Sequence, residues 1–123
     1  MISYAEYKSL GGEKLTEENA EIYLGLAYYD IDSLTFNRIK KYGFENLTEF
    51  QQSVIKKSIV LQADFRLENE NWLNSALSQY SINGVSVNYT KSNTVTIRNG
   101  VFVPNTVLSI LKQSGLCTLN MRI

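Results

Sequence analysis

The chain has 123 residues, of which 44% are hydrophobic and 20% charged, and its formal net charge at pH 7 is zero. These values are typical of one globular domain that buries its own core. The absence of histidine removes the commonest general base and transition-metal ligand. We therefore expect a single domain without enzymatic activity, cofactor or metal.

The cysteine content and the hydropathy favour an intracellular soluble protein. The single cysteine, Cys117, has no partner for an internal disulfide, which suits a reducing compartment. The opening MISYAEYKSL lacks the basic head and apolar run of a signal peptide. No stretch approaches the ~18 consecutive apolar residues of a membrane span.

The first predicted element is a short helix over Tyr4–Leu10. Ser3 and Glu6 have the spacing of a capping box, and Gly11-Gly12 stops the helix. A long helix is then predicted over Thr16–Ile39, with Thr16 as its N-cap. Its apolar residues recur in steps of four and three and share one face: Ala20, Leu24, Ala27, Ile31 and Leu34. A break is expected near Ser33–Phe36, and Gly43 ends the element.

A second long helix is predicted from Thr48 to about Asn71. Thr48 and Gln51 form a second capping box. The main apolar stripe is Val54, Ser58, Leu61 and Phe65, with Ile55, Ile59 and Leu67 beside it. A helix of this length spans about 36 Å, enough to pack antiparallel on the first long helix.

The period of the apolar pattern then changes from about 3.6 to 2, which predicts strands. Asn83-Gly84 and Asn99-Gly100 are hairpin-turn signals. The simplest interpretation is an antiparallel meander with strands near 79–82, 85–90, 94–98 and 101–103; the alternative is one long hairpin.

Pro104 suits the first turn of a closing helix, and Gly115 suits the position after its end. The buried side of this helix is expected to consist of Val107, Leu108 and Leu111. The last residues alternate, with Cys117, Leu119, Met121 and Ile123 on one face of a predicted strand. Such a strand pairs either with the domain's own sheet or with the sheet edge of a neighbouring chain.

Charge is distributed unevenly along the chain. Residues 1–45 contain eight acidic and five basic residues, whereas residues 73–123 contain four basic residues and no acid. An acid-free half is compatible with contact to nucleic acid, but four basic residues are few for a binding footprint. A polar β region rich in Asn, Ser and Thr is the simpler interpretation.

The remaining candidate residues favour structural roles. Asp30 and Asp32 would point about 200° apart on a helix, which is poor geometry for a shared metal or an acid–base pair. No histidine is available to activate Cys117. Lys40-Lys41 and Lys56-Lys57 are interpreted as solvated helix faces. Trp72 is either a lid on the core or an interface anchor.

Three stretches together resemble a known family: YAEYKSLGG, LTEENAEIYLGLAYYDIDSLTFNRI and NGVFVPNTVLSILKQSGLCTLNM. They are similar to the head–tail connector (adaptor or head-completion) proteins of tailed bacteriophages and prophages. The most specific piece is the D-x-L-T-F-x-R-I run at Asp32–Ile39.

The predicted elements together indicate an α+β fold, mainly α, and the resemblance is compatible with it. It would contain two long antiparallel helices, short N- and C-terminal helices, a small β-hairpin or meander protrusion and a C-terminal strand. The helical part would cover about residues 3–72, the protrusion about 79–103, and the closing helix and tail 104–123.

The resemblance also implies a structural virion protein of the neck, assembled in the bacterial cytoplasm. It would form a ring, a dodecamer in the virion, between the portal protein and the next tail-side connector or tail terminator. The ring would help to retain packaged double-stranded DNA, without sequence specificity and without contact to a membrane.

Specific residues can be assigned to these expected contacts. The tail would dock on the portal through Leu116, Cys117, Leu119, Met121 and Ile123. Lys91 and Arg98 would lie near the channel or the next ring, and subunit contacts would involve Asp32, Phe36, Arg38 and Trp72. The alternative is a small helical nucleic-acid-binding regulator, which would need a basic recognition helix; neither long helix is basic.

Overall fold

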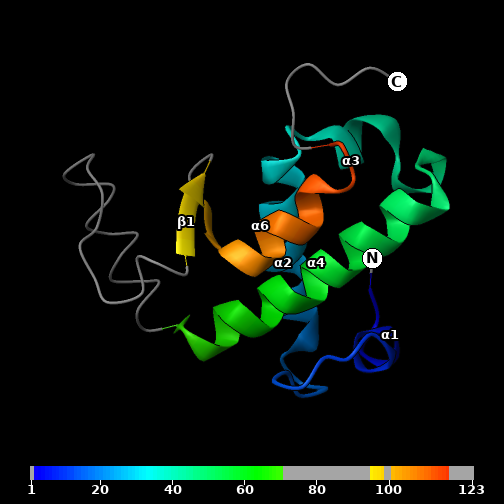
Figure 1. Ribbon diagram of the computed structural model, residues 1–123. Helices are drawn as coiled ribbons and strands as arrows, with labels where there is room; N and C mark the ends of the chain where they lie inside the picture. Colours follow the sequence, from blue (N-terminus) through cyan, green and yellow to red (C-terminus); the bar gives the residue numbers. More distant parts are fainter. Residues whose placement is uncertain (1, 71–94, 99–100, 117–123) are drawn as a thin grey trace.

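The computed structural model describes residues 2–70, 95–98 and 101–116, which form a mainly helical α+β fold. The elements are α1 (Tyr4–Ser9), α2 (Ala20–Leu34), α3 (Arg38–Tyr42), the 3₁₀ helix η1 (Phe44–Asn46), α4 (Glu49–Glu68), β1 (Val95–Arg98), β2 (Val101–Pro104) and α6 (Asn105–Lys112). Helix α4 runs diagonally across α2 with opposite sense, and α6 packs against α4 (Figure 1). The predicted fold class and the two long packed helices are confirmed.

The capping box of α4 is confirmed, whereas only the Ser3 half of the capping box predicted for α1 is formed. The Ser3 hydroxyl accepts a hydrogen bond of 3.1 Å from the amide of Glu6, and α1 is followed by Gly11 at φ +94°. In α4, Thr48 and Gln51 form both bonds of the capping box. Helix α4 ends at Glu68, slightly before the predicted end.

The prediction that Thr16 caps the long helix is wrong, because α2 begins at Ala20. The side chain of Asn19 accepts a hydrogen bond of 2.8 Å from the amide of Thr16, and the Thr16 carbonyl accepts one of 2.9 Å from Ala20. An asparagine that bonds to nearby backbone favours a turn over helix. Residues 16–19 therefore form a turn before α2.

The predicted break after α2 is confirmed. Phe36 and Asn37 adopt φ of +58° and +60°, a left-handed conformation that is uncommon outside glycine. The Thr35 hydroxyl donates to the carbonyl oxygens of Ile31 and Asp32 and so closes α2. The chain then enters α3 in a new direction; we call the segment Asp32–Ile39 the elbow.

The β1–β2 hairpin is antiparallel, with Val95 opposite Pro104 and Arg98 opposite Val101. This register matches a two-residue connection at Asn99-Gly100 and confirms the last two predicted strands. The predicted strands near 79–82 and 85–90, and the C-terminal strand, lie outside the described residues. Pro104 is the N-cap of α6 rather than part of its first turn, and Gly115 has the expected positive φ of +77°.

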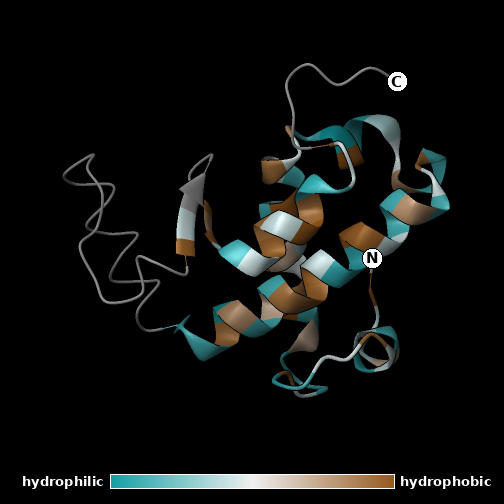
Figure 2. Ribbon diagram, viewed as in Figure 1, coloured by the Kyte–Doolittle hydropathy of each residue, from teal (hydrophilic) through white to brown (hydrophobic). Residues whose placement is uncertain are grey.

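The core lies where α2, α4, β2 and α6 meet (Figure 2). Its fully buried side chains include Ile31, Leu34, Ile55, Ile59, Val103, Val107, Leu111 and Leu116. The predicted stripe of α4 is mostly correct, but Leu61 is only partly buried. Gln62, which the apolar pattern did not include, is 1% exposed.

Candidate functional site

The elbow binds the residue from which the C-terminal tail departs. The Arg38 guanidinium donates a hydrogen bond of 3.1 Å to the carbonyl oxygen of Leu116 and lies 5.3 Å from the centroid of the Phe36 ring. The Gln51 side chain donates one of 3.0 Å to the carbonyl oxygen of Ser114. The elbow and the start of α4 therefore fix the chain up to Leu116.

Three of the four predicted subunit-contact residues, Asp32, Phe36 and Arg38, come together in this elbow. Asp32 is only 3% exposed, and its carboxylate accepts a hydrogen bond of 3.1 Å from the Lys40 amide. This places Asp32 inside the molecule as the anchor of α3. Phe36 and Arg38 are partly exposed. Trp72 lies outside the described residues.

The residues predicted to contact the portal and the channel are described only in part. The Leu116 side chain is fully buried, so it belongs to the core and is not free to dock on a partner. The other four tail residues, Cys117, Leu119, Met121 and Ile123, lie outside the described part, as does Lys91. Arg98 pairs with Val101 through the backbone, and its side chain is not among the described ones.

A buried charge network crosses from α2 to α4. The Arg66 guanidinium donates to both carboxylate oxygens of Asp30, over 2.5 and 2.8 Å. The Gln62 amide donates to Asp30 over 2.9 Å and to the carbonyl oxygen of Phe102 over 3.1 Å. The hydrogen bond to Asp30 raises the pKa of Arg66 above its usual value. The interpretation of Asp30 as a structural residue is confirmed. Its partners Arg66 and Gln62 were not predicted from the sequence.

A second buried network attaches α1 to α4. The Tyr7 hydroxyl donates to the Asp64 carboxylate and accepts hydrogen bonds of 2.8 Å each from the amides of Lys14 and Leu15. Burial and then the bond to Asp64 raise the pKa of Tyr7 above its ordinary value of 10.0. The sequence pattern did not indicate this pair, whose two residues are 57 positions apart.

Of the two α4 lysines interpreted as solvated, Lys57 is exposed as predicted and Lys56 is only partly exposed, and both contact the N-terminal segment. Lys56 forms an ion pair with Glu6 and lies 5.6 Å from the centroid of the Phe44 ring. Lys57 donates a hydrogen bond of 3.3 Å to the carbonyl oxygen of Leu10. Lys40 and Lys41 are exposed, as predicted.

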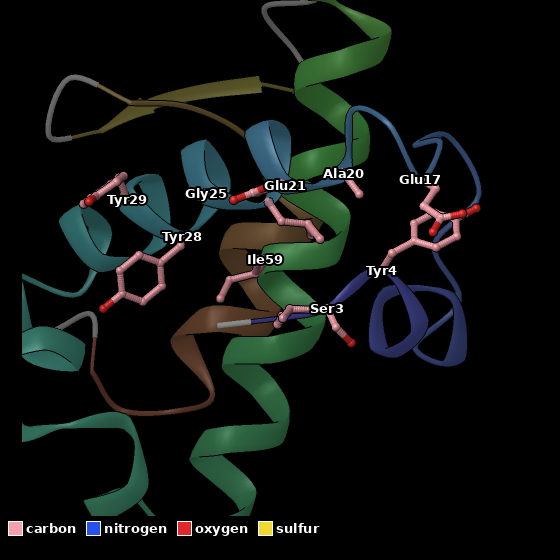
Figure 3. Close-up of a pocket in the computed structure, with 11 residues that line it drawn as sticks. Ser3, Tyr4, Glu17, Ala20, Glu21, Gly25, Tyr28, Tyr29 and Ile59 are labelled. Carbon is pink, nitrogen blue, oxygen red and sulfur yellow. The ribbon is translucent and has the colours of Figure 1, made fainter.

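A groove with a volume of about 490 Å³ runs beside α2 (Figure 3). Its floor is apolar, with Ala20, Leu24 and Ile59. Tyrosines and glutamates surround it, among them Tyr4, Tyr28, Tyr29, Glu17 and Glu21, and Glu21, Gly25, Tyr28 and Tyr29 come from successive positions along α2. A groove of this kind suits an apolar or aromatic side chain with a basic neighbour.

The side of α2 away from the core is also apolar. Ile22 is 64% exposed, Leu26 40% and Tyr29 65%. These positions are separated by steps of four and three, so their side chains form one stripe on the helix. We call Ile22, Leu26 and Tyr29 the outer face of α2; Tyr29 connects it to the groove.

Within residues 2–70, 95–98 and 101–116, no cluster of three or more acidic or cysteine side chains could hold a metal ion. No described helix is long and apolar enough to cross a membrane. Comparison with known proteins finds no protein-family model, no curated protein and no solved structure that matches the sequence. The elbow, the groove and the outer face of α2 are thus the surfaces from which a function is argued.

Proposed function

We propose that this chain is a subunit of a head–tail connector ring of a tailed bacteriophage or prophage. In this role it would bind the portal on one side and a tail-side protein on the other, and would act by contact rather than by catalysis. The proposal rests on the resemblance carried by Asp32–Ile39 and is supported by one structural observation: this segment forms the elbow that binds Leu116.

The elbow, which carries the most specific part of the resemblance, has a structural role: it holds the start of the tail. Arg38 binds the last described backbone carbonyl, and Asp32 fixes the helix that carries Arg38. A tail that leaves from a fixed point loses less conformational entropy when it docks than one that leaves from a loose end. The elbow therefore supports a tail that acts as a docking segment for the portal.

Electron microscopy of the purified chain, alone and mixed with a portal protein from the same genome, tests this proposal. We expect rings attached to one end of the portal in the mixture. A chain that neither forms rings nor binds the portal would contradict the proposal. Binding of the chain to DNA in a sequence-specific manner, without binding to the portal, would favour the regulator instead.

Two truncations separate docking from folding. Removal of residues 117–123 leaves Leu116 and its bond to Arg38 in place, and we expect a folded protein that no longer binds the portal. Removal of residues 116–123 also deletes a fully buried side chain, so it should destabilise the domain itself. Unaltered portal binding by the shorter deletion would exclude the tail as the docking segment.

Charge reversal tests the predicted channel contacts. The double variant Lys91→Glu, Arg98→Glu should assemble normally and retain packaged DNA less well, because acidic side chains repel phosphate. Lys8→Glu with Lys112→Glu is the matched control, since both lysines are exposed in α1 and α6. Normal DNA retention by the first variant would remove Lys91 and Arg98 from the channel.

A further inference from the structure

We infer that the outer face of α2 is a contact between two copies of this chain, in which the two α2 helices pack antiparallel. The inference goes beyond the connector function and does not depend on it. An antiparallel pair of identical helices closes at two copies. The proposed contact is therefore one that the free protein forms. It differs from the head-to-tail contact between the subunits of a ring.

The first support is that α2 is apolar on both sides. Its core side is buried at Ala20, Leu24 and Ile31, and its opposite side exposes Ile22, Leu26 and Tyr29. A surface helix normally carries polar residues opposite its core face, and a helix that is apolar all round is normally buried. Two copies packed through this stripe would remove it from water.

The second support is Gly25, in the middle of α2. A glycine in a helix interior is less stable than alanine, so it usually serves a packing purpose. Among the described residues nothing packs against Gly25 closely enough to require a glycine, because an added Cβ would meet no atom within 4 Å. Gly25 lies three residues after Ile22 and four before Tyr29, and so borders the outer face. Its missing side chain allows a second helix to approach closely.

The third support is the charge near the two ends of α2. Glu17 and Glu18, in the turn before α2, and Glu21, in its first turn, are exposed, while Lys40 and Lys41 are exposed in α3, the short helix that follows its end. None of these five forms an ion pair with another described residue. Helix α2 is about 22 Å long, and antiparallel packing would bring the acidic end of each copy to the basic end of the other. Parallel packing would bring like charges together, so the charge selects the antiparallel arrangement and a second copy as the occupant.

Sedimentation equilibrium of the full chain over a range of concentrations tests the contact. We expect a monomer–dimer equilibrium that ends at twice the mass of the chain. Leu26→Lys should be monomeric, because it places a charge in the centre of the apolar stripe. Phe50→Lys, which alters a 56% exposed apolar residue of α4, is the matched control and should dimerise like the wild type. A monomeric wild type, or a Leu26→Lys dimer of unchanged affinity, would overturn the proposal.

Gly25→Ala distinguishes loss of the contact between copies from loss of the fold. The variant should unfold at a higher denaturant concentration than the wild type when both are dilute, while its dimer dissociation constant rises at least tenfold. An unchanged dissociation constant would show that no helix packs against Gly25.

The charge variants test the antiparallel arrangement. Glu17→Lys with Glu18→Lys makes both ends of the contact positive, and Lys40→Glu with Lys41→Glu makes both ends negative. Each double variant alone should be monomeric, and an equimolar mixture of the two should recover the dimer. Failure of the mixture to associate would overturn the pairing of these charges. A wild-type mass that grows beyond two copies would show a head-to-tail contact and exclude the antiparallel pair.

Discussion

The side chain of Arg38 donates a hydrogen bond to the backbone carbonyl oxygen of Leu116, 78 residues further along the chain. The donor stands just after the left-handed pair Phe36-Asn37, which turns α3 away from α2. The acceptor is the carbonyl of a residue whose side chain is fully buried. One side chain thus joins the elbow to the segment that follows α6.

Replacement of Arg38 by Met should lower the free energy of unfolding by about 1.5–3 kcal/mol, the usual range for a hydrogen bond to a charged group. The Met side chain retains apolar contact with Phe36 and removes the donor. Lys40→Met, at an exposed neighbouring position, should change stability by less than about 0.5 kcal/mol. Urea unfolding of both variants measures the difference, and equal values would mean that the bond adds nothing.

Replacement of Asp30 by Ala should cost about 3–5 kcal/mol, because it leaves Arg66 partly buried without its carboxylate. Glu68→Ala breaks the pair between Lys14 and Glu68, whose side chains are 49% and 59% exposed, and should cost at most about 1 kcal/mol. Thermal or urea unfolding distinguishes the two. The double replacement Asp30→Leu, Arg66→Met should recover much of the loss, and no recovery would argue against an ion-pair origin.

Replacement of Tyr7 by Phe should cost about 2–4 kcal/mol at pH 7, because the amides of Lys14 and Leu15 lose their acceptor. The folded pKa of Tyr7 is raised, so its proton stabilises the fold below about pH 10, and this contribution is lost as pH rises through the folded pKa. The stability difference between wild type and Tyr7→Phe should therefore shrink above about pH 10.

The pH measurement uses the difference between the two proteins, since Tyr23 and Tyr28 also have raised pKa values and are present in both. Urea unfolding at several pH values between neutral and strongly alkaline provides the curves. A difference that stays constant through the alkaline range would show that Tyr7 does not hold its proton more tightly in the folded state.

Two glycine-to-alanine replacements should have opposite signs. At Gly12 a Cβ would lie 2.1 Å from the Tyr7 ring, which three hydrogen bonds hold in place, so we expect a loss of about 3 kcal/mol or more. At Gly25 nothing lies within 4 Å, and alanine should add about 0.5–1 kcal/mol in dilute solution. Denaturation of the dilute proteins tests both, and a harmless Gly12→Ala would mean that Tyr7 can move.

The left-handed residue Asn37 allows a test of the elbow. Asn37→Gly should leave stability unchanged or raise it by up to about 1 kcal/mol, since glycine adopts this conformation without strain. Asn37→Val should destabilise by about 1–2 kcal/mol, because a β-branched residue resists positive φ. Position 37 is exposed, so burial does not affect the comparison, which urea unfolding of the two variants measures.

The sequence predicted the elements whose signals are local. Thr48 and Gln51 define the start of α4 because a capping box needs only residues three apart. The prediction that Thr16 is an N-cap was wrong because the Asn19 side chain, three residues further on, bonds to the Thr16 amide and stabilises a turn there. A cap at Thr16 and a turn closed by Asn19 both satisfy local spacing rules, so spacing alone does not distinguish them.

The candidate site was predictable as a segment but not in its contacts. Asp32 was expected at a subunit surface because it belongs to the recognisable motif. It is buried because the break at Phe36-Asn37 folds the Lys40 amide back onto its carboxylate. Gln62 interrupts an apolar stripe, and its partners Asp30 and Phe102 are 32 and 40 residues away in sequence. Periodicity carries no information about pairs at such separations.

The Gln62 side chain, in α4, connects the hairpin to α2. One amide group donates to a carboxylate of α2 and to a carbonyl of β2. To displace β2 from this site would leave a buried donor without its partner and would loosen the side chain that also steadies Asp30. If displacement of β2 alters α2 in this way, linkage requires that a ligand favouring one position of the hairpin and a partner bound to α2 change each other's affinity.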